Sequence, residues 1–117
     1  MDVSEKLQLK RGSAVFLVNP PKGLDLKVPV SKKDSGAAVL VFALDSKQLA
    51  TASKPAVDAA RQDRLSWIAY PKAGQLGTDL SRDKLFQLMK PFGIEGVRLV
   101  SLDRTWSAMR FRPSGHG

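Results

Sequence analysis

Residues 37–44 read AAVLVFAL, and this unbroken apolar run decides the fold class of the chain. A strand that is apolar at every position has no side that faces water, which is typical of parallel sheets covered on both faces. The run is much shorter than the roughly 20 residues that cross a bilayer as a helix. We therefore predict that it is the central strand of a sheet in a folded, water-soluble domain.

Two shorter segments before this run have strand character. Residues 13–18 (SAVFLV) are apolar and end at residues 19–23 (NPPKG), where two prolines and a glycine stop ladder pairing. Residues 24–30 (LDLKVPV) alternate apolar and polar side chains, but Pro29 limits them to an edge or an irregular extension. Because nothing here has the pattern of a crossover helix, we expect one face of the sheet to be thinly covered.

A helical stretch and a further strand follow the central run. Residues 47–62 place apolar side chains near helical spacing after a polar cap at Asp45 or Ser46. Because Pro55 interrupts this stretch, either one helix kinks there or Ser53 caps a second short helix. Residues 65–70 (LSWIAY) then form the next strand.

The chain ends in a helix and a hairpin. Ser81 is predicted to cap a helix with one apolar stripe, and Gly93 ends it. Residues 97–102 (VRLVSL) and 106–112 (WSAMRFR) have strand character, and the polar residues 103–105 between them are typical of a hairpin turn.

This order of elements predicts an α/β fold. Strands that alternate with helices favour parallel βαβ units with right-handed crossovers. We predict one domain over residues 1–117, with flexible ends at about residues 1–10 and 113–117. Its fold would be a small Rossmann-like, mainly parallel sheet with two or three helices and a C-terminal antiparallel hairpin that supplies one antiparallel edge strand.

Composition limits the partners. The chain has 19 Lys+Arg against 11 Asp+Glu, a net charge of +8, and no cysteine, which excludes disulfides and thiolate chemistry. Such a balance favours anionic partners, including nucleic acid. The basic residues are spread over both ends without a basic arm, however, so an evenly solvated surface is the preferred interpretation. We expect a cytoplasmic protein that does not bind membranes.

A binding site is expected at the carboxyl ends of the parallel strands, as in other open α/β sheets. Residues 70–83 (YPKAGQLGTDLSRD) follow one of these strands, and their two glycines, Lys72, Arg82 and helix start suit a phosphate or carboxylate. The spacing K-x-G-x-x-G matches neither of the common nucleotide-binding loops, and two aspartates would repel an anion. We therefore interpret the segment first as a turn and a helix cap.

Three aspartates and one histidine have side chains that are common in catalytic and metal sites. Asp45, Asp79 and Asp103 could bind Mg²⁺ or act as an acid and base pair, but each also has an ordinary role as a cap or turn residue. His116 is the only histidine, and a tail position cannot hold a general base in place. We assign no catalytic residue, no metal and no cofactor.

Three segments carry a family resemblance. They are residues 67–72 (WIAYPK), 78–83 (TDLSRD) and 102–112 (LDRTWSAMRFR). Together with GSAVFLVNPPKG and AVLVFA, they resemble a family of small bacterial proteins catalogued as a domain of unknown function. The resemblance implies a compact α/β domain similar to a reduced methyltransferase-type sheet, and it implies no activity, cofactor or partner.

The prediction is an accessory domain that binds a small anionic ligand or a protein at an anion-tolerant loop edge. An enzyme on a trimmed nucleotide or methyltransferase-like fold and a nonspecific nucleic-acid binder are the alternatives. The candidate site residues are Lys22, Lys72, Gly74, Gly77, Thr78, Asp79, Ser81, Arg82, Asp103, Thr105 and Trp106.

Overall fold

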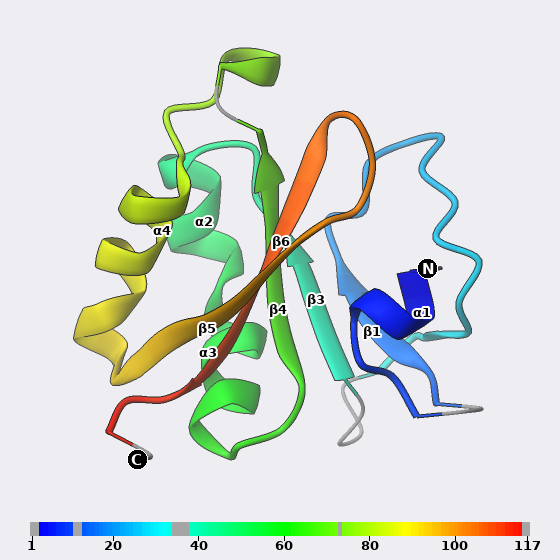
Figure 1. Ribbon diagram of the computed structural model, residues 1–117, viewed down its shortest axis with the longest axis horizontal. Helices are drawn as coiled ribbons and strands as arrows, with labels where there is room; N and C mark the ends of the chain where they lie inside the picture. Colours follow the sequence, from blue (N-terminus) through cyan, green and yellow to red (C-terminus); the bar gives the residue numbers. More distant parts are fainter. Residues whose placement is uncertain (1–2, 11–12, 34–37, 73, 116–117) are drawn as a thin grey trace.

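A six-stranded mixed sheet organises the chain in the computed structural model, which describes residues 3–10, 13–33, 38–72 and 74–115 (Figure 1). The strands lie in the order β2-β1-β3-β4-β6-β5. Their bounds are β1 (Val15–Val18), β2 (Val30–Ser31), β3 (Ala38–Phe42), β4 (Ser66–Pro71), β5 (Ile94–Ser101) and β6 (Trp106–Pro113).

The predicted central strand is confirmed from Ala38 onward, and Ala37 lies outside the described residues. All five residues of β3 are buried, and β3 pairs in parallel with β1 and β4 on its two sides. Residues 24–30, expected to be irregular, lead into β2, a two-residue strand that extends the sheet beside β1.

The predicted hairpin forms, but its strands lie in another order than expected. β6 pairs antiparallel with both β4 and β5, so the antiparallel strand is inside the sheet and β5 is at the edge. Because β4 and β5 are both antiparallel to β6, they run in the same direction. Three pairings are parallel and two are antiparallel, which makes the sheet mixed.

One face of the sheet is covered by three helices, α2 (Ser46–Ala52), α3 (Lys54–Arg61) and α4 (Arg82–Met89) (Figure 1). Two short 3₁₀ turns, η1 (Gln75–Gly77) and η2 (Lys90–Phe92), flank α4. Apolar side chains of β3, β4 and β6 pack beneath the helices, including Val39, Val41, Ile68, Met109 and Phe111. Burial of such side chains is the main stabilising contribution in this layer.

Proline divides the first helical stretch into two helices. Pro55 lies in the first turn of α3, where a missing N–H costs no hydrogen bond, so the second of the two expected arrangements is confirmed. Ser53 separates the helices, but its side chain makes no capping hydrogen bond. The predicted cap at Ser81 and the left-handed Gly93 after η2 are both confirmed.

The opposite face has an irregular cover, in agreement with the thin covering expected. It consists of α1 (Val3–Lys6), the residues after it, and the chain between β1 and β2. Leu7 is fully buried there, and the indole N–H of Trp67 donates to its carbonyl oxygen at 3.1 Å. Within residues 3–10, Leu7 is therefore part of the core, and Val3 and Leu9 pack against it.

None of the helices in the described ranges has the length and apolar character needed to cross a membrane. His116 lies outside the described residues.

Candidate functional site

A groove opens at the carboxyl edge of the sheet, where the sequence predicted a site. It has a volume of about 360 Å³ and lies where the loops after β1, β3, β4 and β5 meet. Its lining includes Lys22, Leu44, Leu76, Asp103, Thr105 and Trp106. Four of the predicted site residues therefore come together here, from segments about 80 positions apart in the chain.

Exposed apolar side chains form one part of this groove. Leu76 is 61% exposed and its backbone is left-handed (φ 53°), a conformation that is costly for a residue with a large side chain. Leu44 is 42% exposed, directly after β3. Beneath them Trp106 packs edge to face on Phe42, with 5.3 Å between ring centroids, which fixes the aromatic part of the groove.

Charged side chains lie at the rim of the same groove. Lys22 is exposed, and no carboxylate in the described part of the chain forms an ion pair with it. Asp103 has a structural role, because its Oδ1 accepts hydrogen bonds from the amides of Thr105 and Trp106 at 2.8 and 2.7 Å. These bonds close the hairpin turn and hold Thr105 at the groove.

Hydrogen bonds between loops fix the groove walls. The side-chain amide of Gln75 donates to the carbonyl of Arg104 at 3.0 Å, which joins η1 to the hairpin turn. Lys72 donates from its backbone to Thr105 O at 2.7 Å, and its Nζ donates to Ser101 Oγ at 2.7 Å. The Lys72 ammonium is therefore directed to the end of β5.

A second hollow of about 290 Å³ adjoins the groove, since both are lined by Pro21, Leu44 and Trp106. Asn19 and Gln48 add polar groups to it. The Gln48 side chain accepts from the Leu44 amide at 2.7 Å, so it holds the chain between β3 and α2 in place.

The loop from Gly74 to Ser81 forms the turn and cap that its sequence predicted. Gly74 and Gly77 have positive φ angles and no neighbour within 4 Å of an added Cβ, so they serve the turn rather than a close approach. Thr78 accepts from the amide of Leu80 at 3.0 Å, and Ser81 accepts from the amide of Lys84 at 3.2 Å.

Asp79 connects two helices. Its carboxylate accepts from the backbone and side chain of Ser46, the first residue of α2, and from Lys84 Nζ at 3.1 Å. The Ser46 donors, followed by Lys84, lower the pKa of Asp79 far below its ordinary value. Asp45 caps α2 by accepting from the amide of Gln48 at 2.8 Å. Both carboxylates thus have structural roles.

Arg82 lies away from the carboxyl-edge groove. It is on the first turn of α4 and lines another groove, between α4 and β5. Its guanidinium is 3.4 Å from Asp83, and both side chains are mostly exposed, so this pair contributes little to stability. The three residues of the predicted anion-binding edge therefore lie apart: Lys22 lines the carboxyl-edge groove, Lys72 contacts the end of β5, and Arg82 lines the groove between α4 and β5.

Sequence reasoning missed the apolar part of the groove. Leu44 and Leu76 were not candidates, because an isolated apolar residue beside a turn has no periodic pattern. The available signal was a leucine between two glycines in GQLG, residues 74–77, where a turn would be expected to be polar.

Comparisons with protein-family models, with curated proteins and with solved structures found no match for this chain. A functional assignment therefore depends on the geometry of the grooves.

Proposed function

We propose that this protein is a small binding domain whose carboxyl-edge groove holds a ligand with a flat apolar body and one anionic group. The observation that carries the proposal is the position of Leu76. Its exposed side chain stands on a strained backbone in the same groove as Trp106 and Lys22. Residues held in such conformations cluster at binding and active sites.

The charges define the ligand more closely. Lys22 offers an ammonium without an ion-pair partner in the described ranges, so it suits a carboxylate or a phosphate monoester. Asp103 is in the same groove and would repel a second negative charge. A single anionic group near Lys22, with the apolar body over Leu44, Leu76 and Trp106, fits both conditions.

The test is a titration of isotope-labelled protein followed by NMR. Indole-3-acetate combines a flat apolar body with one carboxylate, tryptophol has the body without the charge, and inorganic phosphate has the charge without the body. We expect indole-3-acetate to shift the amides of Lys22, Leu76 and Thr105 more strongly than either of the others. Equal shifts with phosphate alone, or no shifts in these loops, would contradict the proposal.

Matched variants identify the groups that bind. Lys22→Ala and Leu76→Ser are each expected to weaken indole-3-acetate binding about tenfold, a difference of about 1.4 kcal/mol. Lys47→Ala removes another exposed lysine, on α2 and outside the groove lining, and should leave binding unchanged. If Lys47→Ala weakens binding as much as Lys22→Ala, net charge rather than the groove is responsible.

The fold and family proposals rest on the remaining observations. The parallel strands β1, β3 and β4, with α2 and α3 between the last two, support a Rossmann-like kinship. The segments WIAYPK, TDLSRD and LDRTWSAMRFR support membership of the bacterial family that they resemble.

A further inference from the structure

The edge strand β5 has the features of a surface that accepts another strand. It spans eight residues without a proline, and Val97 and Leu99 are 42% and 43% exposed. Its pairing with β6 is irregular between Gly96 and Arg98, so its regular part runs from Arg98 to Ser101. Of the described strands, only β6 pairs with it. A long edge strand with exposed apolar side chains is a template for pairing with another chain.

Backbone groups of β5 point outward from the sheet at its C-terminal half. The amide of Leu102 donates to Trp106 O at 2.9 Å, so the N–H and C=O of Leu102 face β6. In an antiparallel pair every second residue faces its partner strand, so the N–H and C=O of Leu99 and Ser101 face away from β6. Lys6 Nζ already donates to the outward carbonyl of Ser101 at 2.8 Å. The outward N–H and C=O of Leu99 thus face the edge where an added strand would lie.

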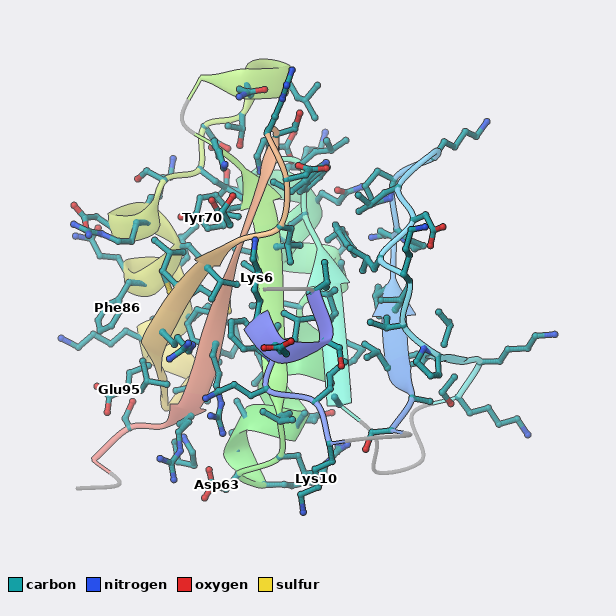
Figure 2. The ribbon with its side chains drawn as sticks, turned by 45° about the vertical axis from the view of Figure 1, so that its right-hand side comes forward. Lys6, Lys10, Asp63, Tyr70, Phe86 and Glu95 are labelled. Atoms are coloured by element: carbon teal, nitrogen blue, oxygen red, sulfur yellow. The ribbon has the colours of Figure 1, made fainter. Side chains whose placement is uncertain are left out.

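A groove runs between this edge and α4. It has a volume of about 330 Å³, and its lining includes Arg82, Phe86, Val97, Arg98, Leu99 and Met109. In Figure 2, Phe86 on α4 and Glu95 near the start of β5 are labelled along the same side of the molecule. Gly96 keeps the groove floor closely packed, because a Cβ there would be 2.3 Å from Met109 Sδ.

Charge determines what kind of strand fits. Arg98 is exposed, lies directly opposite Arg110 on β6, and has no carboxylate partner within the described part of the chain. Arg82 and Asp83 on α4 both line the groove 3.4 Å apart, so their charges offset each other and Arg98 supplies the net positive charge at this edge. Pairing β5 with β5 of a second copy would bring these arginines together, on chains that each carry a net charge of +8.

We propose that the β5–α4 groove binds an extended acidic segment of another protein as an added strand. Successive side chains of a strand point to opposite faces. Apolar residues of the segment would pack on Phe86, Val97 and Leu99, while the alternate acidic residues would lie on the face of Arg98. Addition of a peptide strand to an exposed sheet edge is a common mode of peptide recognition. This surface is separate from the carboxyl-edge groove, so the two proposals stand or fall independently.

The experiment is calorimetry and NMR with end-blocked peptides of the same length as β5. One peptide alternates glutamate and valine, a second alternates lysine and valine, and a third is the glutamate peptide with its backbone N-methylated at alternate residues. We expect the glutamate peptide to bind at least about tenfold more tightly than the other two and to shift the amides of Val97 and Leu99. Absence of binding, equal binding of the lysine peptide, or shifts confined to other strands would overturn the proposal.

Two variants and a control test the surface itself. Arg98→Glu should weaken the glutamate peptide about tenfold and strengthen the lysine peptide. Leu99→Pro removes an outward N–H at a position where an edge strand tolerates proline, and its folding is checked by circular dichroism. Arg104→Glu makes the same charge change in the hairpin turn and should have little effect. Equal loss in Arg104→Glu would overturn the proposal. A concentration-dependent dimer that Leu99→Pro dissociates would also overturn it, by assigning this edge to a second copy.

Discussion

The two faces of the sheet are covered in different ways. Three helices cover one face of the sheet. Because their backbone groups are hydrogen-bonded within each helix, they stabilise that face through the packing of apolar side chains. The other face is covered by a four-residue helix and irregular chain, whose polar backbone needs partners such as the indole N–H of Trp67. This irregular chain also supplies Lys22 to the carboxyl-edge groove. The helical face thus contributes stability, and the irregular face leaves loops available for binding.

The largest predicted effect is a loss of stability that differs between the two faces of the sheet. Leu85 on α4 and Leu7 after α1 are both 0% exposed, one on each face. We expect Leu85→Ala to lower the free energy of unfolding by about 2–5 kcal/mol, and Leu7→Ala by an amount near the lower end of that range, because an irregular segment can collapse around a lost side chain.

Chemical denaturation and hydrogen exchange provide the measurement. In Leu7→Ala, faster exchange should be confined to residues 3–10 and their neighbours, whereas Leu85→Ala should accelerate exchange throughout the core. If both variants lost the same free energy of unfolding and exchanged faster throughout the protein, the covers of the two faces would unfold together with the core.

The next effect tests how tightly the helical face is packed at its outer strand. A methyl group at Gly96 would clash with Met109 Sδ and lie 3.3 Å from Phe86. Gly96→Ala should therefore destabilise the protein by about 1–3 kcal/mol. In the double variant Gly96→Ala/Met109→Ala, the loss should be smaller than the sum of the two single losses, because the space vacated by Met109 accepts the methyl. Strict additivity, measured by urea denaturation, would contradict this packing.

Local patterns explain how much of this arrangement the sequence predicted. The Ser81 cap, the stop at Gly93 and the hairpin each depend on neighbouring residues, and all were predicted correctly. The position of β6 between β4 and β5 depends on contacts about 40 residues apart, between Trp67 and Arg110 for example, which no local period records. The carboxyl-end rule placed Lys22 and Thr105 at the groove, but no local pattern marked the exposed side chain of Leu76.

A smaller effect, visible in acid, tests how α2 and α4 are tied together on the helical face. The pKa of Asp79 is lowered by its donors from Ser46 and Lys84, so the folded state favours the ionised carboxylate. Stability from this group is present above the unfolded pKa of about 3.9 and is lost as pH falls below it toward the folded value.

Asp79→Asn removes that contribution at every pH. The thermal midpoint of wild type should therefore exceed that of Asp79→Asn by a constant amount at pH 5 to 7, and the difference should shrink below about pH 4. Asp83→Asn, which removes an exposed carboxylate in the first turn of α4, is the control. A difference that stays constant down to pH 2.5 would contradict the role of the Asp79 carboxylate.

The smallest effect is a gain, on the edge of the irregular face. Arg98 and Arg110 lie directly opposite each other on β5 and β6, and like charges in such a pair are destabilising. Burial, followed by the nearby Arg112 and Arg98, lowers the pKa of Arg110, which is the expected sign for a guanidinium among like charges. Arg98→Glu should therefore raise the free energy of unfolding by about 0.2–1 kcal/mol, and Arg98→Gln by less. The gain should diminish in 1 M salt, since exposed charges are screened there.

A variant that is more stable and yet loses the acidic peptide would show that the repulsion between Arg98 and Arg110 is retained for binding. An Arg98→Glu protein less stable than wild type would instead mean that Arg98 stabilises the hairpin itself.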